Sequence, residues 1–62
     1  MKCRIDFDVE PNTTYVYEVS CLDEARYKGF ELARAMNRDR WTVTVGDYVA
    51  EFVRKGISFT LA

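Results

Sequence analysis

The chain has 62 residues, a formal net charge of −1 and no histidine. A chain this short forms one domain, here 1–62, and it has no apolar run near the roughly 18 residues that a membrane span needs, so we expect no membrane contact. Without histidine, the commonest general base and metal ligand, we expect neither an enzyme nor a metal or cofactor site. The charge balance also disfavours a chain whose main task is to hold nucleic acid.

The first segment, residues 2–10, alternates apolar and charged residues, which predicts a strand. A turn cluster at residues 11–13 separates it from a second alternating segment, residues 14–20. We expect these strands to form a hairpin with Glu10 opposite Thr14, because this register puts every apolar side chain on one face.

The same register makes two further predictions. Glu18 would lie opposite Asp6, on the face away from the core. Cys3 would lie opposite Cys21, where a disulfide is geometrically possible. Because nothing at the N-terminus resembles a signal peptide, we expect a cytoplasmic protein in which both thiols are reduced and buried.

A helix is predicted after the hairpin. Ser20 is its expected N-cap, with Asp23 completing an approximate capping box, and Asn37 is its expected end. Gly29 lies at the centre of the apolar stripe, and we expect it to let the helix approach bulky residues of the sheet. The stripe consists of Leu22, Ala25, Gly29, Leu32, Ala33 and Met36.

Three alternating segments joined by two glycine-containing turns occupy residues 41–62, the pattern of a three-stranded antiparallel meander. Gly46-Asp47 fits a two-residue type II′ turn. A second tight turn is expected at Lys55-Gly56, which would set Phe59 opposite Phe52.

Residues 47–55 have a competing interpretation as a short helix. We favour a strand, because the segment is rich in β-branched and aromatic residues and a strand explains both turns. The predicted fold class is therefore α+β: an antiparallel sheet with the element order β-β-α-β-β-β and one helix packed on one face.

A group of acids is predicted on the face opposite the helix. Charges that keep sheet edges from aggregating are the ordinary explanation. The functional explanation is a negative surface that meets a basic partner, which would account for placing like charges side by side. The set comprises Asp6, Asp8, Glu10, Glu18 and Glu51.

Two weaker candidates lie elsewhere. Tyr27 and Phe30 fall outside the apolar stripe of the helix, Phe30 on its shoulder. Partial burial is the ordinary explanation for such residues, and the functional explanation is apolar contact with a protein. Basic residues gather around the helix end and the second turn, where they complement the helix dipole or contact phosphates. This basic set comprises Arg34, Arg38, Arg40, Arg54 and Lys55.

The order of elements resembles that of several small phage-encoded proteins, among them some type I anti-CRISPR proteins. The shared features are a hairpin, a helix entered through Ser20, Asp23, Glu24 and Ala25, and a meander with glycine turns. The resemblance is one of architecture and transfers no functional residue.

It implies a non-enzymatic inhibitor in the host cytoplasm, a DNA mimic whose acidic face occupies a basic, nucleic-acid-binding surface of a host protein or nucleoprotein complex. The alternative is a nucleic-acid-binding module that uses the basic set. We expect a monomer or a weak homodimer, because an exposed strand edge can pair two copies.

Overall fold

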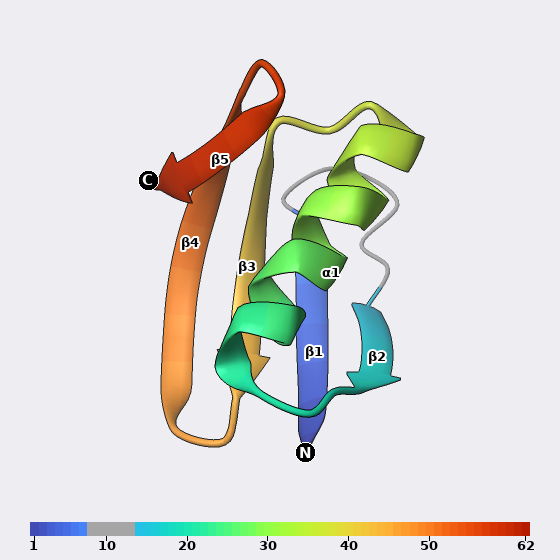
Figure 1. Ribbon diagram of the computed structural model, residues 1–62, viewed down its shortest axis with the longest axis vertical. Helices are drawn as coiled ribbons and strands as arrows, with labels where there is room; N and C mark the ends of the chain where they lie inside the picture. The colour runs from blue at the N-terminus through green and yellow to red at the C-terminus, as the bar shows by residue number, and fades with distance from the viewer. Residues whose placement is uncertain (8–13) are drawn as a thin grey trace.

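The computed structural model describes residues 1–7 and 14–62 and consists of one helix packed on an antiparallel sheet (Figure 1). In the described ranges the sheet has five strands in the order β2-β1-β3-β4-β5. This arrangement confirms the predicted α+β class and the order β-β-α-β-β-β. The elements are β1 (Lys2–Phe7), β2 (Thr14–Glu18), α1 (Leu22–Met36), β3 (Arg40–Val45), β4 (Tyr48–Lys55) and β5 (Ser58–Leu61).

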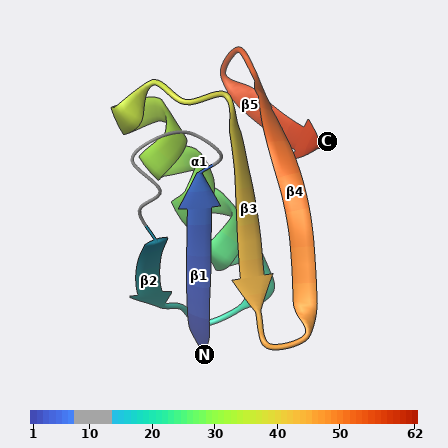
Figure 2. The same ribbon diagram turned by 180° about the vertical axis from the view of Figure 1, so that it is seen from behind.

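The helix covers one face of the sheet, and the described residues leave the other face uncovered (Figure 2). Alternate residues of β1, β3 and β4 point toward α1 and form the core with the buried side of the helix. Its largest fully buried side chains are Trp41, Ile5 and Val43. Phe52 and Phe7 are buried beside them.

The first hairpin has a different register from the predicted one. Asp6, not Glu10, lies opposite Thr14, so the predicted pairing is shifted by four residues. The predicted pairs of Glu18 with Asp6 and of Cys3 with Cys21 are therefore wrong. Each side chain keeps its predicted face, because a shift by an even number of residues preserves the alternation.

Glu18 lies opposite Lys2, and Cys3 lies opposite Tyr17. Both cysteines are free: Cys3 is buried as expected, whereas Cys21 is exposed. Residues 8–10 of the predicted first strand and the predicted turn at 11–13 lie outside the described residues.

The helix begins one residue later than predicted. Cys21, not Ser20, is the N-cap, and it makes no side-chain cap hydrogen bond. Instead the backbone N–H of Ser20, the residue before the N-cap, donates to a carboxylate oxygen of Glu24. This bond is similar to the returning bond of a capping box but is displaced by one residue. At the other end Asn37 adopts the left-handed conformation, φ 56° and ψ 47°, as predicted.

Gly29 packs directly on Trp41, which confirms the predicted close approach. A Cβ atom at this position would lie 2.7 Å from Cδ1 of Trp41 and nearer still to Nε1, so no larger residue fits without movement. Ala25 and Ala33, one turn away on either side, are also buried. These three small residues let α1 lie close to β3.

The meander is confirmed, including β4 where a short helix was the competing interpretation. Its first turn is Gly46-Asp47, with Gly46 at φ +58° as a type II′ turn requires. The second turn is Gly56-Ile57 rather than the predicted Lys55-Gly56. Lys55 pairs with Ser58 and Phe52 with Leu61.

The position of the second turn follows from the same rule as that of the first, namely that glycine takes the first place of the turn. Gly56 has φ +64°, and a two-residue turn of this type places glycine first, so the turn begins at Gly56 and not one residue earlier. The register moves by two residues relative to the prediction. Phe59 therefore still points toward the helix.

Candidate functional site

The uncovered face of the sheet holds those predicted acids that the structure describes. Asp6, Glu18 and Glu51 come from β1, β2 and β4, and each alternates with a residue that points toward the helix. This face, seen from the front in Figure 2, is called the open face below. Asp8 and Glu10 lie outside the described residues.

Two of these carboxylates are held by arginines on the same face. Nε of Arg4 lies 3.0 Å from Oδ2 of Asp6, and the hydroxyl of Thr14 donates to Oδ1 at 2.7 Å. Nη1 of Arg40 lies 4.0 Å from Oε1 of Glu51. The described part of the open face is thus a mixture of both charges rather than an unbroken acidic surface.

Apolar side chains interrupt these charges. Val16 on β2 and Val49 on β4 belong to one row across the open face, separated by Arg4 and Thr44. Both valines are well exposed, Val49 at 65%. Exposed aliphatic groups beside charged ones are a combination that protein interfaces use.

The predicted basic set is divided between two faces. Arg40 alternates with buried Trp41, so it lies on the open face with Glu51. Arg54 lies on the helix side, where one guanidinium nitrogen is 3.4 Å from Oδ1 of Asp39 and 3.4 Å from Oδ1 of Asn37. The structure therefore does not bring all five residues to one surface.

The remaining members of the basic set lie around the same end of the molecule as Arg54. The guanidinium of Arg34 lies over the ring of Phe30, with its carbon 5.6 Å from the ring centre. Lys55 is exposed at the end of β4. Arg38 follows the helix, and its backbone N–H donates to the carbonyl of Ala33 at 2.8 Å.

A groove separates α1 from β5. Its two hollows measure about 290 and 200 Å³, and Tyr27 and Phe59 line both. Tyr27 is 62% exposed, and its ring stands edge-on to Phe59 with 5.3 Å between ring centres. The structure thus places Tyr27 at the surface, as the sequence predicted.

Phe30 differs from that expectation. It is 8% exposed, and its ring centre lies 5.0 Å from that of Phe59 and 6.3 Å from that of Trp41. Phe30 therefore belongs to the core, and the functional prediction that it contacts a partner at the surface is wrong. Helical angle alone misplaced it, because β5 brings Phe59 beneath this shoulder of the helix.

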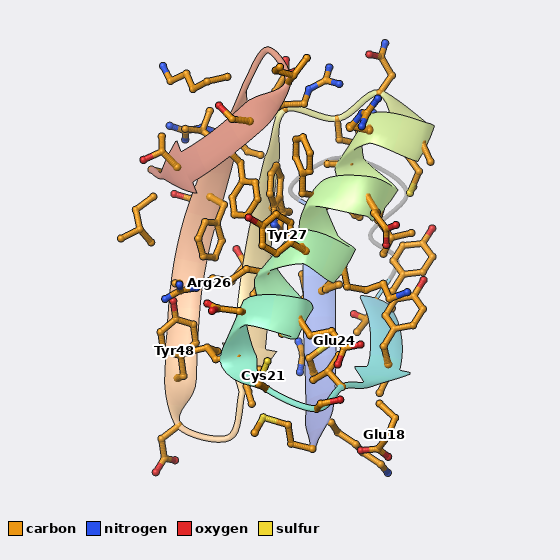
Figure 3. The ribbon with its side chains drawn as sticks, in the orientation of Figure 1. Glu18, Cys21, Glu24, Arg26, Tyr27 and Tyr48 are labelled. Carbon is orange, nitrogen blue, oxygen red and sulfur yellow. The ribbon has the colours of Figure 1, made fainter. Side chains whose placement is uncertain are left out.

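One polar cluster beside the groove was missed by sequence reasoning. Figure 3 shows Arg26 reaching from α1 toward Tyr48 on β4, whose hydroxyl lies 3.3 Å from Nη2. Nη1 of Arg26 also donates to Asp23 at 3.2 Å. The hydrogen bond with Tyr48 raises the pKa of Arg26. The three-residue spacing of Asp23 and Arg26 on a helix could have predicted their ion pair. The contact of Arg26 with Tyr48 spans 22 residues, so no local pattern in the sequence could have predicted it.

Two further groups have perturbed acidity. The backbone N–H of Ser20 lowers the pKa of Glu24, because a hydrogen bond to a carboxylate favours its charged form. Burial raises the pKa of the Cys3 thiol and keeps it protonated. Neither group lines the two hollows between α1 and β5.

In residues 1–7 and 14–62 no group of three or more Cys, Asp or Glu side chains lies close enough together to hold a metal ion. Nor does this part of the chain contain a helix of the length and hydropathy needed to cross a bilayer. Comparison with known proteins found no matching family model, no matching curated protein and no matching solved structure.

Proposed function

We propose that this protein is a small non-enzymatic binding protein, a phage-type inhibitor of the anti-CRISPR or another counter-defence class. Its open face would occupy a basic, nucleic-acid-binding surface of a host protein. The observation that carries the proposal is that Asp6, Glu18 and Glu51, from three strands, share one uncovered face with the exposed Val16 and Val49.

The ion pairs within the open face indicate what kind of surface a partner would present to it. A nucleic-acid mimic needs a row of carboxylates without counter-ions, whereas Asp6 and Glu51 already have arginines within 4.0 Å. Exposed ion pairs contribute only about 0–1 kcal/mol, so a partner's lysine or arginine can replace Arg4 or Arg40 at small cost. The geometry therefore supports a protein surface with mixed polar and apolar contacts better than it supports mimicry.

A photo-crosslinking experiment tests the open face. A photoreactive residue would replace Val49, and, as a matched control, the exposed Ala35 on the helix. The chain would be produced in bacteria that carry a type I CRISPR system. We expect an adduct with a host protein from position 49 but not from position 35, together with restored plating of a targeted phage.

Charge reversal makes the same test quantitative. Asp6→Lys with Glu51→Lys should weaken the adduct and the inhibition at least tenfold, because two contacts with a basic surface become repulsive. The control is Glu31→Lys, which makes the same kind of change on the helix, where Glu31 is paired with Lys28. Equal yields from all three proteins would exclude the open face as the interface.

The alternative function, nucleic-acid binding through the basic set, has its own test. It requires a gel shift at low salt that weakens as the salt concentration rises. It also requires that Lys55→Gln and Arg38→Gln reduce the shift. The division of the set between two faces gives this alternative less support than the open face has.

A further inference from the structure

The two edges of the sheet differ in how well they are protected. Among the described residues β5 pairs only with β4, and the segment 57–62 contains no charged residue and no proline. The other edge, β2, ends in Glu18, and Lys28 lies over its Tyr17 with the ammonium 5.1 Å from the ring centre. Charged side chains and proline are two of the means by which natural proteins prevent edge-to-edge pairing, and β5, although short, has neither.

The direction of the main-chain groups along β5 follows from one hydrogen bond. The N–H of Ala62 donates to the carbonyl of Glu51 on β4 at 2.9 Å. Because these directions alternate along a strand, the main-chain groups of Ser58, Thr60 and Ala62 face β4. Those of Phe59 and Leu61 face away from the sheet.

We propose that β5 pairs antiparallel with β5 of a second copy of this chain, around a two-fold axis at Thr60. In this register Phe59 lies opposite Leu61 of the second copy, and Leu61 lies opposite its Phe59. Each such pair exchanges two main-chain hydrogen bonds, so the outward N–H and C=O groups of both residues are used. The result is one continuous sheet with both helices on the same side.

The side chains on the helix side suit this pairing. Leu61 is 60% exposed and lies opposite Phe52 on β4. The second copy would bring its Phe59 against Leu61 and its Leu61 against Phe59 and the edge-on Tyr27. The pairing therefore covers exposed apolar surface at the mouth of the groove with apolar surface of the same kind.

The register also places no like charges opposite one another on the open face. Within one copy Lys55 lies opposite Ser58, and Glu51 lies opposite Ala62. In the dimer Ser58 would lie opposite Ala62 of the second copy, which joins these two pairs into one row. Each end of the paired strands then has a lysine and a glutamate of opposite copies in one row, three strand spacings or roughly 14 Å apart, so their attraction is weak. A second copy is thus the occupant that the edge fits by symmetry and hydrogen bonding.

The dimer is expected to be weak. Four main-chain hydrogen bonds and two apolar pairs amount to less than a standard interface, which corresponds to a dissociation constant on the order of 0.1 mM. The pairing leaves the open face free and doubles its extent. It does not depend on the proposed inhibitor function, and either proposal can fail without the other.

A disulfide experiment tests the register. The two copies of Thr60 would form a pair without mutual hydrogen bonds, with Cα atoms about 4.5 Å apart, a distance that a disulfide spans. In a Cys21→Ser background, mild oxidation of Thr60→Cys should give a covalent dimer at least tenfold faster than oxidation of Ser58→Cys. The control residue is also exposed and lies on the same strand, but its two copies would lie roughly 13 Å apart.

Sedimentation equilibrium tests the association itself. The mass of the unmodified chain should rise from 7.2 kDa toward twice that value as the concentration increases through the dissociation constant. Thr60→Lys places two like charges at the axis and should remain monomeric, with an unchanged circular dichroism spectrum because Thr60 is exposed. Equal oxidation rates for the two cysteine variants, or an unmodified chain that stays monomeric up to roughly 1 mM, would overturn the proposal.

Discussion

The helix meets the sheet in two different ways. Over β3 it lies so close that Gly29 leaves no room for a Cβ atom beside Trp41, which is 1% exposed. Over β5 the same helix leaves two hollows, and Tyr27 touches Phe59 while remaining largely exposed. One surface is a sealed core, and the other is open to solvent.

The size of the helix residues explains this difference. Small residues face β3, and large ones face β5, where Tyr27 and Phe30 fill the space above Phe59. The helix therefore packs closely on the centre of the sheet and leaves a groove beside its edge strand β5. Tight packing is therefore concentrated over β3, and exposed apolar surface remains over β5.

The largest expected effect is at the centre. Trp41→Ala removes the largest fully buried side chain and should cost about 3–5 kcal/mol of unfolding free energy. A 62-residue chain has little more stability than that, so the variant should be largely unfolded. Urea titration followed by circular dichroism measures it. A cooperative transition near the wild-type midpoint would contradict a core concentrated over β3.

Gly29→Ala should also destabilise, by about 1–3 kcal/mol, because the added methyl overlaps the ring of Trp41. Helix propensity alone predicts the opposite, a gain of roughly 1 kcal/mol. The matched control is Ala35→Gly on the exposed side of the same helix, which should cost about 1 kcal/mol through propensity. A stabilised Gly29→Ala protein would show that the close approach is not required.

Tyr27→Ala should have a smaller effect, about 0.5–1.5 kcal/mol, because it removes one edge-on aromatic contact at the open groove. Thermal unfolding at neutral pH is the measurement. A loss as large as that for Trp41→Ala would mean that the groove over β5 is as important to stability as the centre, and the contrast between the two surfaces would fail.

The smallest expected effect on stability is at the N-terminus of α1, the helix that packs on β3 and borders the groove beside β5. The pKa of Glu24 is lowered by the N–H of Ser20, so its contribution to stability exists at neutral pH. It is lost as the pH falls below the ordinary value of 4.5 and through the lowered pKa of the folded protein. Glu24→Gln should therefore be less stable than the wild type at pH 7, and the difference should shrink in acid. A difference that stays constant from pH 7 to the acid limit would rule out the charged hydrogen bond.

Sequence alone determined the elements and their faces. Alternation of period two identified the strands, and it assigned Ile5, Trp41, Phe52 and Phe59 to the helix side. Gly29 at the centre of the helical stripe indicated the close packing on the sheet. These features are local, because each depends on residues a few positions apart.

Only the tertiary structure decided register, strand order and which charges meet. Period two fixes the face of a side chain but not its partner, so the first hairpin shifted by four residues and the last by two without any change of face. Arg40 was separated from Arg54, and Phe30 was drawn into the core, because contacts between distant strands place them there. The same long-range pairing left β2 and β5 at the two edges of the described sheet, with β1, β3 and β4 between them.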